Sequence, residues 1–209
     1  MTSLLYRGPA PFILASRSPR RQEILGRLGV EFAVRPADID EAEPPGLPPR
    51  ELAMSIAARK AAAVARGLAR GLVLGADTIV VLYLAVLGKP SSPAEARAML
   101  VRLAGRSHVV TTGLALIDAE RGTRCLNWED TTVHMRAASE DEIAAYVATG
   151  EPLDKAGAYG IQGFGATIVE RVEGDYFSVM GLGLRLLVEL LARVGIAYRF
   201  SGGVERADG

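Results

Sequence analysis

Short apolar runs alternate along the chain with longer stretches in which apolar residues recur at helical spacing. The run at residues 11–15 predicts a buried strand, and the periodic positions at 24–28 predict an amphipathic helix that ends at Gly29. After an acidic, Pro-rich loop, an Ala-rich helix is expected at about residues 50–69. The chain therefore begins with a strand, a polar turn and a helix, and a longer helix follows.

A second buried strand begins at Leu72–Leu74, and one acidic residue, Asp77, interrupts an apolar run that resumes at Ile79–Leu82. This pattern allows either one bent strand or a strand followed by a hairpin. The remaining periodic stretches predict three more strands and three more helices. The strands are expected at 108–117, 131–135 and 166–171, and the helices at 93–103, from a capping box at Ser139 and Glu142 to about Gly150, and at 181–194.

Strands and helices alternate throughout, and no internal repeat with a period of about 20 to 50 residues is present. This order predicts an α/β protein with a mixed central β-sheet flanked by helices. No change in composition marks a linker. We therefore expect one domain over residues 1–200, followed by a flexible tail at 201–209.

Nearly half of the 209 residues are apolar, and 24 acidic residues balance 24 basic ones. No overall field would hold such a chain on nucleic acid or on an anionic membrane, so neither is an expected partner. No apolar run approaches the roughly 20 residues of a membrane span, and the run at 11–15 is too short for a signal peptide. Because Cys125 is the only cysteine, no internal disulfide can form, and we expect a cytoplasmic protein.

Only three of the 24 basic residues are lysines, namely Lys60, Lys89 and Lys155. A lysine ammonium acts on phosphate as a compact point charge, whereas an arginine binds as a planar fork. The lysines can therefore mark phosphate-binding positions, or their placement can be chance. The pattern by itself leaves both interpretations open.

A polar turn, Ser16-Arg17-Ser18-Pro19-Arg20-Arg21, joins the first predicted strand to the first helix. Hydroxyls, helix-start amides and guanidinium groups meet at this junction, and the helix dipole adds to their attraction for phosphate. We interpret the turn as an anion-binding site. The alternative is an ordinary helix cap with two solvated arginines.

Asp77 directly follows a buried strand, where α/β proteins commonly form ligand sites. Its carboxylate could hold Mg²⁺, take a proton from attacking water, or do both, and Glu41 is a second acid that could complete the metal shell. An aspartate that caps a turn is the alternative. Lys89 follows closely enough for a hairpin to bring its ammonium back toward Asp77. Gln162 lies in a glycine-rich segment, where its amide could both donate to and accept from a base.

Two other kinds of site are not expected. His108 and His134 are far apart and, with one cysteine, make no zinc-binding spacing, so both are interpreted as core or surface histidines. No Walker loop of the form Gly-x4-Gly-Lys-Ser/Thr occurs.

Six ordered segments resemble the Maf family of nucleoside-triphosphate pyrophosphatases, often called septum-formation inhibitors. These segments are Leu14 to Arg21, Ile39-Asp40-Glu41, Ala58-Arg59-Lys60-Ala61, Gly75-Ala76-Asp77-Thr78, Gly88-Lys89-Pro90, and Asp154 to Gly163. The resemblance covers nearly the whole chain. It implies an α/β fold with a deep substrate cleft, a divalent cation such as Mg²⁺ or Mn²⁺, and cleavage of a nucleoside triphosphate into the monophosphate and pyrophosphate.

The resemblance also implies roles for individual residues. Asp77 would accept the proton and, together with Glu41, bind the metal. Arg20, Thr78 and Gln162 fall at positions tied to substrate choice. The phosphate region would be lined by Ser16, Ser18, Arg21, Lys60, Lys89 and Lys155.

The segment Ala158 to Gly163 resembles the subgroup that acts on dTTP and UTP, whereas the 7-methyl-GTP group typically has Glu at the position of Gln162. An amide can match a pyrimidine face that offers both an acceptor and a donor, while a carboxylate only accepts. We therefore expect hydrolysis of dTTP and UTP. The alternatives are a pyrophosphatase for 7-methyl-GTP or other non-canonical nucleotides, and a non-enzymatic protein that senses nucleotides or regulates division.

The turn Tyr83-Leu84-Ala85 departs from the family, which usually has a polar turn such as Asp-Gly-Glu here. The hairpin that positions Lys89 could therefore differ, or a partner could cover the apolar turn. A homodimer is one expectation.

Overall fold

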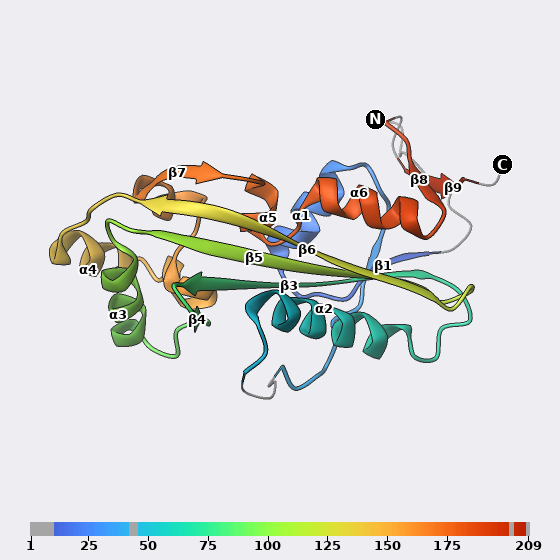
Figure 1. Cartoon of the computed structure of the whole chain (residues 1–209), viewed down its shortest axis with the longest axis horizontal. Coiled ribbons are helices and arrows are strands. Elements are labelled where there is room, and N and C mark those ends of the chain that lie inside the picture. Colours follow the sequence, from blue (N-terminus) through green and yellow to red (C-terminus); the bar gives the residue numbers. More distant parts are fainter. Residues whose placement is uncertain (1–10, 42–45, 201–202, 208–209) are drawn as a thin grey trace. The chain divides into compact units, whose positions relative to one another are not determined.

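The computed structural model describes residues 11–41, 46–200 and 203–207, and these residues form two compact units (Figure 1). Of the described residues, unit 1 contains 11–41, 46–77, 112–129, 181–200 and 203–207. Unit 2 consists of 78–111 and 130–180. Three long strands belong partly to each unit.

Unit 1 contains a sheet with the strand order β2-β1-β3-β5-β6. The short strand β1 (Phe12–Leu14) pairs in parallel with both β2 (Ala33–Val34) and β3 (Leu72–Leu82). Strands β5 (Ser107–Asp118) and β6 (Thr123–Met135) complete this order. Strand β1 is fully buried, as its continuous apolar run predicts.

Three helices cover this sheet, and the chain order explains their placement. Helix α1 (Pro19–Arg27) connects β1 to β2, and α2 (Pro49–Ala65) connects β2 to β3 on the far side of β1. Crossovers between parallel strands are almost always right-handed, so two crossovers that run in opposite directions place their helices on opposite faces. Figure 1 shows α2 on one face, with α1 and the C-terminal helix α6 (Leu184–Arg193) on the other.

Helix α2 lies directly on the sheet because two strand residues have no side chain. A Cβ atom added at Gly75 of β3 would lie 2.1 Å from the Ala57 carbonyl oxygen. One added at Gly113 of β5 would lie 2.6 Å from the Ala53 carbonyl carbon. The helix presents Ala53, Ala57 and Ala61 to the sheet, and all three are fully buried. This contact between backbones determines where Lys60, the residue directly before Ala61, can reach.

Unit 2 contains the strand order β4-β3-β5-β6-β7. Strand β4 (Ala85–Leu87) pairs antiparallel with β3, and β7 (Val169–Glu173) pairs antiparallel with β6. The helical elements are α3 (Pro93–Leu103), α4 (Glu140–Ala148), α5 (Tyr176–Met180) and three short 3₁₀ turns, η1 (Glu151–Asp154), η2 (Ala156–Ala158) and η3 (Gly163–Thr167). Its core includes Leu100, Leu103, Val110, Val133, Tyr146 and Tyr159.

The predicted fold class, an α/β protein with a mixed sheet and flanking helices, is confirmed. Helix α3 coincides with the predicted 93–103, and the capping box is formed by Ser139 and Glu142. For the segment around Asp77, the sequence allowed either one bent strand or a strand followed by a hairpin. The structure has features of both, because β3 continues as one strand through Asp77 and then turns into the β3–β4 hairpin. None of the described helices is long and apolar enough to cross a membrane.

The chain end differs from the flexible tail expected at 201–209. Residues Val204–Arg206 form β9, which pairs antiparallel with β8 (Ile196–Tyr198). Arg206 donates a hydrogen bond to Asp118 over 3.1 Å, and Val204 is buried. The strand β9 has a single apolar residue, Val204, followed by two charged ones, and this pattern does not predict a strand. Residues 201–202 and 208–209 lie outside the described residues.

Candidate active site

Asp77 and Lys60 form a buried ion pair in unit 1. The Lys60 ammonium lies 2.8 Å from Oδ1 of Asp77 and 2.9 Å from Oε1 of Glu41. The lysine and the aspartate are less than a tenth exposed, whereas the Glu41 side chain is more than half exposed. One ammonium therefore joins a buried carboxylate to an accessible one.

The arrangement follows from how α2 packs. Gly75 allows the α2 backbone to approach β3 two residues before Asp77, and Lys60 stands beside the buried Ala61. The guanidinium of Arg59, the preceding α2 residue, donates to the carbonyl of Asp40 and so ties the acidic loop to the helix. These residues lie in separate segments of the sequence, and the packing of α2 brings them together.

The polar turn before α1 is both a helix cap and a cluster of donors. Ser18 is the N-cap residue, and its hydroxyl accepts from the backbone N–H of Arg21 over 3.4 Å. The Ser16 hydroxyl accepts from the Ser18 backbone N–H and from Nη1 of Arg21, both over 3.2 Å. Ser18 therefore caps the helix, but Arg21 is buried rather than solvated, so the turn is not an ordinary cap with two solvated arginines. A cap of this kind is compatible with anion binding at the same turn.

Arg21 is held by a contact that sequence analysis missed. Its Nε donates to the carbonyl of Gly181 over 2.8 Å, across 160 residues of chain. Burial lowers the pKa of Arg21, while the charge of Asp77 raises it and that of Arg20 lowers it. An arginine stays protonated at physiological pH even so. The guanidinium is thus a fixed, desolvated positive charge close enough to Asp77 to be influenced by it.

A divalent cation fits the donor set only in part. Asp77 and Glu41 provide hard carboxylate oxygens, but the described residues contain no group of three or more His, Cys, Asp or Glu side chains that could hold a metal ion. Mg²⁺ commonly binds through one or two carboxylates and completes its shell with substrate phosphates and water. The two carboxylates therefore suit a cation that arrives with a polyphosphate.

Four of the expected site residues belong to unit 2. Thr78 follows Asp77 in β3 and is half-buried, and Lys89 is exposed after the β3–β4 hairpin. The Lys155 ammonium donates to the Glu151 carbonyl and to Asp154, both over 2.6 Å. Gln162 is half-buried in the glycine-rich segment. The hairpin itself forms despite its apolar turn, with Tyr83 at φ 58°.

Arg20 is half-buried in the first turn of α1, next to Arg21. The two histidines are not metal-ligating in arrangement. His108 is buried with its Nε2 2.7 Å from the Tyr159 hydroxyl, and His134 hydrogen-bonds to Ser107. Their interpretation as core and surface histidines agrees with these contacts.

These features define a mixed-sheet α/β protein with a buried, lysine-paired aspartate and a cluster of donors at a helix start. The family model described as Maf-like protein matches residues 11–194. The chain belongs to the Maf family.

Several curated relatives match most of the chain. The dTTP/UTP pyrophosphatase of Moorella thermoacetica is 54% identical over 184 residues, which cover 88% of this chain and 95% of that protein. The dTTP/UTP pyrophosphatase of Gloeobacter violaceus is 48% identical and covers 86% of this chain and 94% of that protein. Among solved structures, the Staphylococcus aureus Ham1 protein covers 92% of this chain and 93% of its own, at 15% identity and a TM-score of 0.45, a likeness too weak to support an argument.

Proposed function

We propose that the protein hydrolyses dTTP and UTP to the corresponding monophosphate and pyrophosphate. The observation that carries this proposal is the buried Lys60–Asp77 pair beside Glu41, within family segments that the chain shares with dTTP/UTP pyrophosphatases. A buried carboxylate with a fixed partner is a suitable general base, because its orientation is already set before the substrate binds.

In this mechanism Asp77 accepts a proton from the water that attacks the α-phosphorus. The bond between the α-phosphorus and the bridging oxygen breaks, and pyrophosphate leaves with the electron pair. Lys60 orients the Asp77 carboxylate through its 2.8 Å contact. Arg21, pre-positioned by Ser16 and Gly181, stabilises negative charge as it develops on the phosphates.

The proposed cofactor is Mg²⁺ or Mn²⁺, held by Asp77 and Glu41. When bound, such a cation would neutralise part of the triphosphate charge. The names of the relatives specify no metal, so the support for it is the carboxylate pair itself.

The remaining residues would bind and select the nucleotide. Phosphate contacts are proposed for the hydroxyls of Ser16 and Ser18 and the ammonium groups of Lys89 and Lys155. Base and sugar selection is proposed for Arg20, Thr78 and Gln162. The side-chain amide of Gln162 makes no hydrogen bond with the part of the chain that the structure describes, so it is available to a base.

The decisive experiment measures pyrophosphate release with Mg²⁺ across dTTP, UTP, CTP, 7-methyl-GTP and the purine triphosphates. We expect dTTP and UTP to be preferred, and Asp77→Asn to lower kcat by about 10²- to 10⁴-fold, the usual cost of losing a positioned base. The control is Asp141→Asn, which removes an exposed carboxylate from α4 and should leave turnover unchanged.

The alternatives predict other results. Preference for 7-methyl-GTP would refute the proposed role of Gln162 in selecting the base, but it would be consistent with Asp77 as the general base. Nucleotide binding without pyrophosphate release, under several metals, would favour a nucleotide-sensing or division-regulating protein.

A homodimer and a cytoplasmic location stay predictions. Tyr83 and Leu84 at the tip of the β3–β4 hairpin are 79% and 93% exposed, and such apolar side chains can serve as a contact between copies. Light scattering after size exclusion, on the wild type and on Leu84→Asp, measures whether they do.

A further inference from the structure

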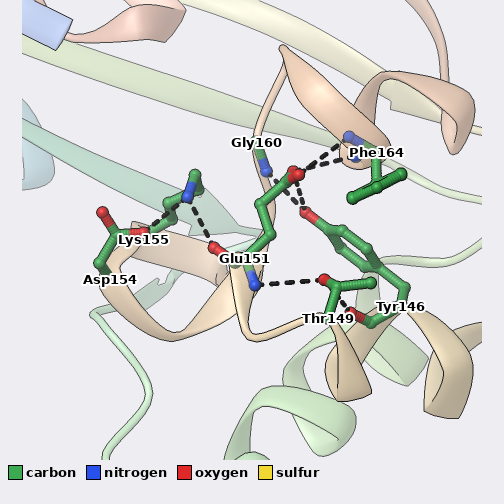
Figure 2. A network of polar contacts seen from close by, with 8 residues as sticks. Tyr146, Thr149, Glu151, Asp154, Lys155, Gly160 and Phe164 are labelled. Carbon is green, nitrogen blue, oxygen red and sulfur yellow. Dashed lines mark hydrogen bonds and ion pairs between the residues drawn. The ribbon is translucent and has the colours of Figure 1, made fainter.

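A single carboxylate, Glu151, collects three hydrogen bonds in unit 2 (Figure 2). Its Oε1 accepts from the Tyr146 hydroxyl over 2.9 Å and from the Gly165 backbone N–H over 3.0 Å, and its Oε2 accepts from the Phe164 backbone N–H over 2.9 Å. The Tyr146 oxygen in turn accepts from the Gly160 backbone N–H over 3.1 Å. One carboxylate and one phenol thereby satisfy three backbone donors of the glycine-rich segment.

The segment fits closely around these two side chains. A Cβ atom added at Gly163, whose φ is +65°, would lie 2.5 Å from Oε2 of Glu151. One added at Gly165 would lie 2.5 Å from the Tyr146 hydroxyl oxygen and 2.2 Å from the Gly160 carbonyl oxygen. Only glycine allows so close an approach of the backbone to the carboxylate and the phenol.

The charge of Glu151 matches its role as an acceptor. Burial raises its pKa, but the hydrogen bonds from Gly165, Phe164 and Tyr146, together with the charge of Lys155, lower the pKa below its usual value. An ionised carboxylate offers acceptors only, so no donor of its own opposes the backbone N–H groups. Glu151 therefore holds the segment as a charge-assisted anchor at neutral pH.

Gln162 lies between the two anchored parts of this segment. Gly160 precedes it by two positions and Phe164 follows it by two, and Gln162 itself has an extended backbone with φ −113° and ψ 171°. Fixing the chain on both sides restricts where the Gln162 side chain can point. A base-reading amide must be held in one orientation if it is to distinguish a donor edge from an acceptor edge.

We propose that Glu151, with Tyr146, is a positioning residue for nucleotide selection: it anchors residues 160–165 so that the Gln162 amide faces the base in one orientation. This inference rests on the proposed function. Neither residue was among the sequence candidates, because their role depends on contacts that only the folded segment makes.

The test compares Glu151→Gln and Tyr146→Phe with Asp141→Asn. Glu151→Gln keeps the shape but turns an NH₂ donor toward backbone donors, and Tyr146→Phe removes only the hydroxyl. Asp141→Asn removes an exposed carboxylate from α4, the helix that carries Tyr146. Hydrogen exchange at residues 160–165 and the ratio of kcat/KM for dTTP over CTP are measured for each, since thymine and cytosine exchange donor for acceptor at N3 and at position 4 of the ring.

For Glu151→Gln we expect exchange at Phe164 and Gly165 to become about tenfold faster or more. The dTTP over CTP ratio should fall by about tenfold, mainly through KM for dTTP. Tyr146→Phe should show the same changes to a smaller extent, with Gly160 most affected, and Asp141→Asn should resemble the wild type.

An unchanged dTTP over CTP ratio in both variants would overturn the inference, even if their melting temperatures fell, because a purely structural role lowers stability without changing selectivity. The dissociation constants of dTTP and CTP are measured in parallel, because their ratio reports selectivity without requiring turnover. If the wild type bound dTTP selectively without hydrolysis, the proposed function would fail while the anchor could still be judged. If it bound the two nucleotides equally, the anchor proposal would fail.

Discussion

At the scale of single residues, the site depends on buried charges that have fixed partners. Lys60 and Asp77 are 2.8 Å apart and both are buried, so burying either charge without its partner would lower the stability of the fold. His108 presents a different case, because it is buried and neutral, and its Nδ1 has no hydrogen-bond partner among the described residues. The two features give separate predictions.

Lys60→Met should destabilise the fold by about 3 kcal/mol or more, because it leaves the Asp77 carboxylate buried without its ammonium. Adding Asp77→Asn to this variant should recover part of the loss. Urea unfolding of the two single variants and the double variant measures the coupling. Strictly additive effects would show that the pair contributes nothing to stability.

The stability of the fold should fall as the pH is lowered from 7 to 5. Burial, with a smaller contribution from the charge of His134, lowers the pKa of His108 from 6.5 to about 4. Between these two values the unfolded chain binds a proton that the folded chain does not, so His108 contributes a loss of about 2 kcal/mol over this range.

His108→Gln should make the unfolding free energy less dependent on pH in this window. Urea unfolding at pH 7 and pH 5 compares this variant with the wild type. An equal pH dependence in the wild type and His108→Gln would rule out this assignment.

At the scale of elements, the contact between α2 and the sheet positions Lys60. The helix can approach only because Gly75 and Gly113 have no side chain where the α2 backbone passes. Helix α2 therefore brings the Lys60 ammonium to Asp77, although its sequence indicates only an Ala-rich helix. Its position, more than its helicity, matters for the site.

Gly75→Ala should cost about 1–3 kcal/mol or more, since the new Cβ would lie 2.1 Å from the Ala57 carbonyl oxygen and α2 would have to shift. Turnover should fall as well, because Lys60 would move with the helix. Gly26→Ala is the matched control. It lies in α1 with no atom within 4 Å of the added Cβ, so it should stabilise the protein by about 0.5–1 kcal/mol.

At the scale of the whole molecule, ligand binding should be visible as added stability. The 24 acidic and 24 basic residues of the chain balance, so attraction for a nucleotide would come from local charges such as Arg21 rather than from net charge. A cation shared between the carboxylates and the phosphates would make nucleotide and metal bind more tightly together than separately.

A non-hydrolysable dTTP analogue at about 100 times its dissociation constant should raise the unfolding free energy by about 2.7 kcal/mol in the presence of Mg²⁺. Removing the metal with a chelator should abolish most of this gain, and Glu41→Gln should reduce it. Thermal unfolding with and without each component gives the result. An equal gain without any metal would contradict the proposed roles of Asp77 and Glu41 as metal ligands.

The sequence by itself determined the fold class and most of the elements, because strand and helix periodicity are local properties of the chain. It also indicated the segments proposed to carry the chemistry, including Asp77, the polar turn before α1 and the segment around Gln162. The pattern did not predict β8 and β9, which form a separate two-stranded sheet through their pairing with each other.

Only the tertiary structure decided which residues meet. Arg21 reaches Gly181 across 160 residues, Lys60 joins Glu41 to Asp77, and Glu151 binds the backbone of a segment that lies further along the chain. These contacts depend on how elements pack, and packing is determined by the shapes of side chains that are distant in sequence, above all by the absence of one at Gly75.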